Sequence, residues 1–156
     1  MNIRRAVAED LEMVDLLLSQ VLEIHASIRP DIFIPGTRKY TDEELLELFK
    51  DDTRPVFVAE KDGEFLGYCF CEIQERKGVT NMKDMKTLYI DDLCVNESRR
   101  GLHVGKALYD FVLSYAKEIG CHNVTLHVWE GNDSARAFYD KMGFGIQKTL
   151  MEKIIE

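Results

Sequence analysis

Hydrophobic and polar positions follow two different periods along this chain, and each period predicts a different kind of element. Residues 2–7 form a short β-rich run, which predicts a strand. Residues 8–27 have acidic side chains early and apolar side chains at helical spacing, which predicts an amphipathic helix. The apolar positions of this helix are Leu11, Val14, Leu17, Leu18, Val21 and Ile24.

The next third of the chain predicts a loop, a short helix and three strands. Residues 28–40 contain two prolines and a glycine, a composition typical of a loop. Thr41 followed by Glu44 is a capping-box pattern and predicts a second, shorter helix. Two β-rich runs then flank an Asp62-Gly63 step, which is typical of a hairpin turn. A further β-rich run over residues 86–95 predicts a third consecutive strand.

The last third alternates helix and strand. A helix is predicted from Val104 to about Ile119, and a strand over residues 122–130. A helix capped by Asn132 or Asp133 follows, and residues 144–155 predict a terminal strand or hairpin. The order β-α-α-β-β-β-α-β-α-β(β) is mixed rather than regularly alternating. It predicts an α+β fold in which helices cover both faces of one central sheet.

Composition narrows the class of protein. The chain of 156 residues is long enough for one domain with a sizeable core, so residues 1–156 are expected to form a single domain. The formal net charge of -8 argues against nucleic acid as a partner and suits a cationic small molecule or peptide. No run approaches the roughly 18 apolar residues of a membrane span, so we expect no membrane partner and a cytoplasmic protein. The four cysteines form no CxxC pair, which indicates reduced thiols and no metal site.

One stretch, "VNESRRGLHVGKALYDFV", raises a question of chemistry because Arg100, Gly101 and Gly105 stand where a helix begins. A helix N-terminus has about four unpaired N–H groups and a partial positive charge, so a glycine-containing turn there is suited to a pyrophosphate. Arg100 and Lys106 would add positive charge. The alternative is a plain strand-to-helix turn in which the glycines only relieve backbone strain. This stretch alone leaves both interpretations open.

A second stretch, "NDSARAFYDKMGF", favours the ligand-binding interpretation over a plain turn. Together the two stretches resemble the GCN5-related N-acetyltransferase (GNAT) superfamily in order and separation. Arg100, His103 and Gly105 fall on the fixed positions of its motif R/Q-x-x-G-x-G/A, with His103 where glycine is usual. The second family motif, N-x-x-A-x-x-x-Y followed by G-F, is matched without a gap by Asn132, Ala135, Tyr139, Gly143 and Phe144.

The resemblance implies a GNAT fold with a mostly antiparallel sheet, and transfer of an acetyl group from acetyl-coenzyme A, as cosubstrate, to an amine. It implies that the cofactor is held by the strand near its end and by the turn that follows. The strand residues are Leu93, Cys94 and Val95, and the turn residues are Arg100, Gly101, Leu102, His103, Val104, Gly105 and Lys106. Asn132, Ala135 and Tyr139 complete this expected cofactor site. Tyr139, by matching the family tyrosine, would donate a proton to the departing thiolate.

Acetyl transfer also needs a base, because an alkyl ammonium with a pKa near ~10 is almost wholly protonated at pH 7. Asp91 and Asp92 are adjacent acids in a β-rich run, and alternation predicts side chains on opposite faces. His127 lies five residues before Asn132, and histidine is the residue type best suited to proton transfer near neutral pH. Each of the three has an alternative structural role, as a loop cap, a substrate-attracting charge or a core histidine, and the sequence does not choose.

The acceptor pocket of the proteins that this chain resembles is built by the loop between the first two helices, the end of the fifth strand and the terminal hairpin. Phe33 and Trp129 would give an aromatic wall, and Glu130 would attract a cation. A polyamine, an aminoglycoside-like amine, a free amino acid and a protein N-terminus all remain open, as does a homodimer. The second candidate function is a non-catalytic acyl-coenzyme A binding or regulatory module, which the His103 departure favours.

Overall fold

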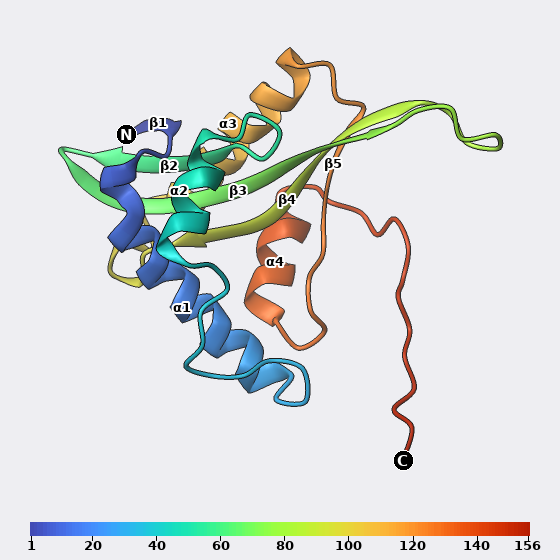
Figure 1. Ribbon diagram of the computed structural model, residues 1–156, viewed down its shortest axis with the longest axis horizontal. Coiled ribbons are helices and arrows are strands. Elements are labelled where there is room, and N and C mark those ends of the chain that lie inside the picture. Colours follow the sequence, from blue (N-terminus) through green and yellow to red (C-terminus); the bar gives the residue numbers. More distant parts are fainter.

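The computed structural model describes all residues 1–156 and is built on one five-stranded sheet (Figure 1). The strand order is β1-β2-β3-β4-β5, so neighbours in sequence are neighbours in the sheet. Antiparallel pairing joins the first four strands, and β5 pairs with β4 in parallel. The strands are β1 (Asn2–Arg5), β2 (Val56–Lys61), β3 (Glu64–Arg76), β4 (Met85–Val95) and β5 (Asn123–Leu126).

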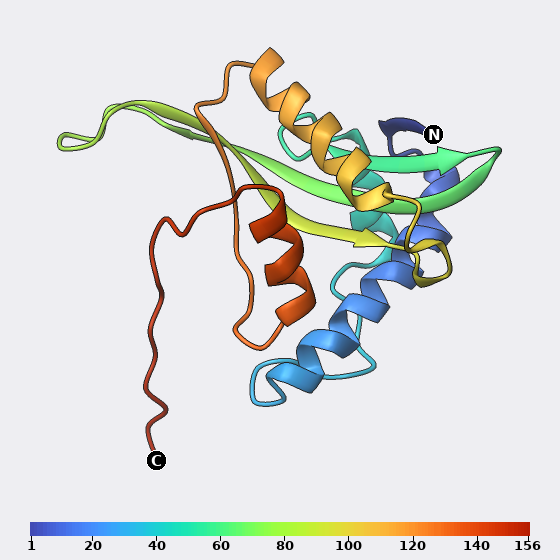
Figure 2. The ribbon, with the colours of Figure 1, turned by 180° about the vertical axis from the view of Figure 1, so that it is seen from behind.

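Helices cover both faces of this sheet, as Figure 2 shows from behind. Side chains of α1 and α2 pack on one face with the buried Tyr68 and Phe70 of β3. Side chains of α3 pack on the opposite face, and α4 follows β5. The α-helices are α1 (Leu11–Ile28), α2 (Asp42–Lys50), α3 (Val104–Glu118) and α4 (Asp133–Lys141), with short 3-10 turns η1 (Ala8–Asp10) and η2 (Glu97–Arg99).

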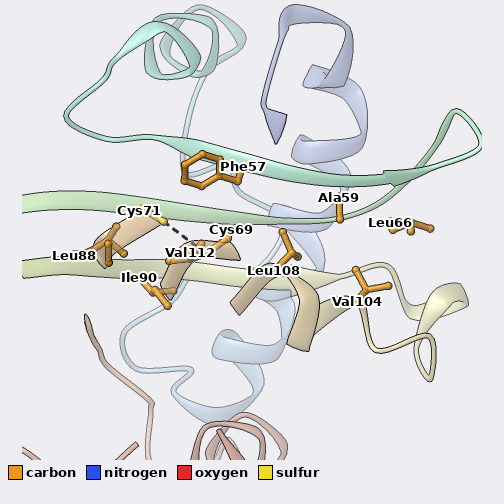
Figure 3. Packing of buried hydrophobic residues seen from close by; sticks show 11 residues of the cluster. Phe57, Ala59, Leu66, Cys69, Cys71, Leu88, Ile90, Val104, Leu108 and Val112 are labelled. Carbon is orange, nitrogen blue, oxygen red and sulfur yellow. Dashed lines mark hydrogen bonds between the residues drawn. The ribbon is translucent and has the colours of Figure 1, made fainter. Parts of the chain in front are cut away.

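The hydrophobic core between the sheet and α3 buries the apolar side chains on this face of the sheet (Figure 3). Val104, Leu108 and Val112 recur at helical spacing and are fully or nearly fully buried against the sheet. On β3, Cys69 and Cys71 point into the same core, with their sulfur atoms 3.7 Å apart. The two residues share one face of the strand, and both are free thiols.

The predicted α+β class, the central mixed sheet and the helices on both faces are confirmed. The capping box of α2 is present, because the Thr41 hydroxyl accepts a hydrogen bond from the Glu44 amide at 3.2 Å and the Glu44 carboxylate accepts one from the Thr41 amide at 3.1 Å. The Asp62-Gly63 step turns the β2–β3 hairpin with both residues at positive φ. Asn132 rather than Asp133 is the N-cap of α4.

Two expectations about the end of the chain are wrong. Residues 144–155 form no strand or hairpin, because their backbone finds no strand to pair with inside this chain. The fifth strand ends at Leu126, and residues 127–130, which were expected to continue it, have no partner in the sheet.

No helix combines the length and the apolar character needed to cross a bilayer.

Candidate active site

The site is shaped by a β-bulge in β4. Cys71 of β3 pairs with Ile90, and the preceding Phe70 pairs with Asp92, so Asp91 is an extra residue on β4. The parallel pairing of β4 with β5 ends at the same point, where Ile90 pairs with Leu126. Residues 92–95 therefore have β3 on one side and no strand on the other. An unpaired strand edge of this kind can bind an extended ligand through backbone hydrogen bonds.

The bulge corrects the expectation that Asp91 and Asp92 point to opposite faces. Strict alternation fails here because one extra residue shifts the phase of the strand. The Asp92 carboxylate accepts a hydrogen bond of 2.5 Å from the hydroxyl of Tyr68, which lies in the core under α1 and α2. Asp91 forms an ion pair of 3.0 Å with Lys39, in the loop between those two helices. Both carboxylates thus lie on the face that α1 and α2 cover.

Asp92 is the acid whose proton affinity the fold changes most clearly. Burial raises the pKa of Asp92 to about 6, and the neighbouring Asp91 adds to this, while the Tyr68 hydroxyl and Lys39 oppose it. Burial and the Asp92 charge also raise the pKa of the Cys94 thiol to about 12. Cys94 is therefore a neutral, half-buried thiol. Nothing in the sequence marked Tyr68 as the partner of Asp92, because a tyrosine in a strand is usually core.

Six consecutive amides between β4 and α3 have no acceptor inside the chain. The N–H groups of residues 101–106 donate to no backbone carbonyl, and α3 has no side-chain cap. The first amide of this region to donate is that of Ala107, to the His103 carbonyl at 3.0 Å. Unpaired amides at a helix N-terminus favour an anion, and pyrophosphate is suited to such a turn. Lys106 and Arg100 flank this turn, in ion pairs with Asp110 and Glu97.

Glycine is favoured at the two glycine positions of this turn for different structural reasons. Gly101 has a φ of 91°, which side chains disfavour. Gly105 instead allows close packing, because a Cβ there would lie 3.3 Å from the Phe138 ring of α4. His103, at the position where glycine is usual, is itself left-handed with φ 58° and ψ 29°. The backbone shape of a glycine is thus retained with a histidine, and its side chain is exposed.

Helix α4 brings Tyr139 to the same region. The amide oxygen of Asn132 accepts a long hydrogen bond of 3.4 Å from the Ala135 amide and so caps the helix. Burial raises the pKa of Tyr139 well above its ordinary value, and the nearby acidic groups of Cys69 and Asp92 raise it further. The raised pKa keeps the phenol protonated, and no hydrogen bond of its hydroxyl contributes to the shift.

His127 belongs to a different segment from Asp92 and Tyr139. It follows β5, is exposed, and its Nδ1 lies 2.9 Å from the hydroxyl of Tyr89. Tyr89 stands two residues before Asp91 on β4, so the His127 contact is on the same face of the sheet as the two carboxylates. Glu130 is exposed in the turn beyond it.

An aromatic cluster lies between α1 and the segment after β5. The rings of Phe33 and Trp129 meet edge to face at 5.4 Å between centroids, as expected for a shared wall. His25 joins them, 5.2 Å from Phe33, and burial lowers its pKa. The Arg29 guanidinium covers the Trp129 ring at 5.8 Å. Neither His25 nor Arg29 was among the site residues predicted from the sequence.

A cleft of about 640 Å³ opens between α1, η2 and the start of α4. Three acidic side chains line it, those of Glu23, Glu97 and Asp133, and the N-cap Asn132 lies among them. This lining favours a cationic group. No group of three or more His, Cys, Asp or Glu side chains is arranged to hold a metal ion.

Comparison with known proteins gives consistent results. Residues 18–144 match the model of the Acetyltransferase (GNAT) family. An N-alpha-acetyltransferase from Sulfurisphaera tokodaii is 34% identical over 111 residues. A solved mutant structure of the BH1408 protein from Bacillus halodurans is 31% identical, with a TM-score of 0.95 and 100% of both chains covered. An aminoglycoside N-acetyltransferase solved in complex with CoA shares the fold, with a TM-score of 0.71, 18% identity and 99% of both chains covered.

The aligned part of the Sulfurisphaera tokodaii protein is 68% of this chain and 65% of that relative. The chain thus spans slightly less than two thirds of the length of that curated relative.

Proposed function

The chain belongs to the acetyltransferase (GNAT) family, and from this premise we propose that it is an acetyl-coenzyme A-dependent N-acetyltransferase that acts on a primary amine of a small molecule or peptide. We further propose that residues 1–156 act as one acetyltransferase domain. The observation that carries the proposal is the run of unpaired amides at residues 101–106, which begins six residues after the unpaired edge of β4.

This arrangement fits a long ligand with an anionic end. The amides of residues 101–106 would hold a pyrophosphate, and the free edge of residues 93–95 would hold an amide-containing arm by strand-like hydrogen bonds. His103 keeps the left-handed backbone that the turn needs, so its departure from glycine does not remove an amide from the set. Acetyl-coenzyme A, when bound, supplies the thioester that makes the acetyl group transferable.

Asp92 is the base that the geometry favours. A carboxylate with a pKa of about 6 is mostly ionised at pH 7.5, yet it takes up a proton more readily than an ordinary aspartate. It would accept a proton from the substrate ammonium, directly or through water, so that the neutral amine can attack. Asp91 is held by Lys39 and the exposed His127 by Tyr89, so we propose that they position substrate rather than accept its proton.

Tyr139 would complete the transfer. As the new C–N bond forms and the C–S bond breaks, the departing sulfur gains an electron pair and needs a proton, while the nitrogen releases one proton that restores the donor. A half-buried phenol that stays protonated and whose hydroxyl makes no hydrogen bond is suited to donate it. An amide on the free edge of residues 93–95 would stabilise the charge that develops on the carbonyl oxygen.

The acceptor would bind against the Phe33 and Trp129 wall. The edge-to-face pair and the acidic cleft next to α1 together favour a ligand with an apolar body and a cationic amine. Glu130, which is exposed at the end of this wall, would add attraction for the ammonium group.

The test is thiol release from acetyl-coenzyme A in the presence of polyamines, amino acids, aminoglycosides and short peptides. We expect release to depend on one class of amine and to fall by about 100-fold or more in Tyr139→Phe, the usual size of a lost acid or base contribution. Tyr109→Phe is the matched control, because Tyr109 also packs on Phe144, at 5.6 Å, but belongs to α3. It should retain activity.

Two results would count against the proposal. Calorimetry that detects no binding of acetyl-coenzyme A at millimolar concentration would remove the cofactor assignment. Cofactor binding with no acceleration by any amine would instead favour the non-catalytic acyl-coenzyme A binding module. Equal loss of activity in both tyrosine variants would show that α4 packing, and not proton donation, is what Tyr139 provides.

A further inference from the structure

One amine of the chain itself lies beside the carboxylates of the proposed acceptor site. Lys39 belongs to the loop that returns along α1 to α2 (Figure 1), and its Nζ lies 3.0 Å from the Oδ2 atom of Asp91. Lys39 is the only lysine that forms an ion pair with either Asp91 or Asp92. The acid that is proposed to position the acceptor is thus already paired with an alkyl ammonium group.

The Lys39 ammonium also lies close enough to act on the other groups of the acceptor site. Burial lowers the pKa of His25, and the charge of Lys39 lowers it further. His25 belongs to the aromatic cluster with Phe33 and Trp129. The same charge opposes the rise in the pKa of Asp92 that burial produces. The amine is therefore near both the aromatic wall and the proposed base, where the proposed function places the substrate ammonium.

Lys39 is accessible and weakly held. Its side chain is 54% exposed, its one ion pair is with Asp91, and the Tyr40 ring lies 5.3 Å from its Nζ. The alternative role of this contact is to tether the loop to the sheet. A single exposed ion pair contributes little to stability, so it is a weak tether, and the amine is free to leave Asp91 without disturbing the fold.

Protonation keeps this amine from reacting without help. Burial lowers the pKa of Lys39, but the charge and the hydrogen bond of Asp91 outweigh burial, so the net pKa is raised. Lys39 is therefore an ammonium at neutral pH, and uncatalysed acetylation does not favour it over an ordinary lysine. A base must remove its proton before its nitrogen attacks a thioester. Preferential acetylation at Lys39 would thus report catalysis by the site.

We propose that the chain acetylates its own Lys39, taking the acetyl group from acetyl-coenzyme A bound to the same chain when no amine acceptor is present. This inference rests on the proposed function, because it uses the same thioester and the same base. Nothing beyond acetyl-coenzyme A is needed, and the modified atom is the Nζ of Lys39.

The atoms and protons of this step balance. Asp92 accepts one proton from the Lys39 ammonium, and the neutral Nζ attacks the carbonyl carbon of the thioester. A bond forms between Nζ and this carbon, the C–S bond breaks, and the sulfur leaves with the electron pair and takes a proton from Tyr139. The nitrogen releases a second proton, which restores Tyr139, and the proton on Asp92 passes to solvent. The products are N-acetyl-lysine, the free thiol of coenzyme A and one proton.

Acetylation also changes the acceptor site. N-acetyl-lysine carries no charge, so Asp91 loses its partner and becomes available to the ammonium group of a free acceptor. The unmodified chain holds its own cation at this carboxylate, and a cationic acceptor has to displace it. The acetylated chain has no such competitor.

The first test is the intact mass and the peptide map of the full chain after incubation with saturating acetyl-coenzyme A and no acceptor. We expect one acetyl group per chain, located at Lys39, at a rate that does not depend on protein concentration. Lys50 is the internal control, because it is a 76% exposed lysine of α2 whose ion pair is with Glu47. Acetylation should be at least about 100-fold faster at Lys39 than at Lys50, and Asp92→Asn should remove most of this difference.

Three results overturn the proposal. The first is acetylation that is no faster at Lys39 than at Lys50, and the second is a rate that rises in proportion to protein concentration. The third is an equal gain in mass in Lys39→Arg, which keeps a cation beside Asp91 but has no amine to acetylate. Thiol release with an added amine is measured on the same sample. Amine-dependent release without acetylation of Lys39 overturns self-acetylation alone, whereas absence of both overturns it together with the proposed function.

The effect on the acceptor has its own readout. Lys39→Gln is uncharged like N-acetyl-lysine, whereas Lys39→Arg keeps the charge. KM for a cationic amine should be about two- to fivefold lower in Lys39→Gln than in Lys39→Arg, the size expected when one exposed ion pair no longer competes. Equal KM values in the two variants would overturn this effect while leaving self-acetylation intact.

Discussion

Replacing Asp92 by asparagine is expected to stabilise the protein at neutral pH while strongly lowering the proposed acetyl-transfer activity. Burial raises the pKa of this carboxyl from 3.8 to about 6 in the folded protein, so folding favours the protonated form. A shift of this size corresponds to about 3 kcal/mol, since one pKa unit is 1.36 kcal/mol. Asparagine keeps an oxygen that can accept the Tyr68 hydrogen bond and carries no charge.

The sign of the pH dependence follows from that raised pKa. Below pH 3.8 the carboxyl is protonated in both states, so the native protein and the Asp92→Asn variant should have similar free energies of unfolding. As the pH rises from 3.8 through about 6, the native protein should lose up to about 3 kcal/mol relative to the variant and then level off. Urea unfolding of both proteins at half-unit steps from pH 4 to pH 8 measures this difference, and all other acids cancel from it.

Asp91→Asn is the matched control, because it removes the adjacent carboxylate and leaves Asp92 in place. It should keep the pH-dependent loss, displaced to slightly lower pH, because Asp91 helps to raise the pKa of Asp92. The kcat/KM of the native enzyme should fall on the acid side with an apparent pKa of about 6, and Asp92→Asn should lower it by about 100-fold or more. A stability difference between native and Asp92→Asn protein that does not change between pH 4 and pH 8 would refute the reasoning.

Two further pairs of variants test the shape of the cofactor site. His103→Gly should raise the free energy of unfolding by about 0.5–1 kcal/mol, because glycine adopts the left-handed backbone without strain. His103→Val should lower it by about 1–2 kcal/mol, because valine is β-branched. Urea unfolding measures both, and equal stability of the two variants contradicts the left-handed backbone at residue 103. Deletion of Asp91 should remove the bulge and lower turnover about 100-fold while changing the free energy of unfolding by less than about 2 kcal/mol. Asp91→Ala keeps the bulge and removes only the proposed substrate-positioning carboxylate, so it should lose less turnover than the deletion. Matched losses in these two would show that the side chain matters and the bulge does not.

Much of the fold was open to prediction because its signals are local. The capping box at Thr41 and Glu44, the Asp62-Gly63 turn and the helical spacing of Val104, Leu108 and Val112 each depend on residues near in sequence. The contacts that were missed are set by distant segments. Tyr68 meets Asp92 across the β3–β4 pair, and Arg29 reaches Trp129 from another element. The strand expected over residues 144–155 was wrong, because β-rich composition is a local signal and does not say whether a pairing edge lies within reach.

The bulge is a different case, because the sequence does carry its signal. Leu88 and Ile90 lie two apart and face the core under α3, and Leu93 and Val95 lie two apart and pack against the same core. Ile90 and Leu93 also share this face, although they are three positions apart in the sequence. In an unbroken strand, residues on one face are an even number of positions apart. One extra residue is required between them, and only Asp91 and Asp92 stand there. The phase shift alone therefore predicts that both acids share a face, and it coincides with the end of β4–β5 pairing at Ile90. A single inserted residue thus opens the edge proposed for the cofactor and turns the proposed base toward the face where the substrate would bind.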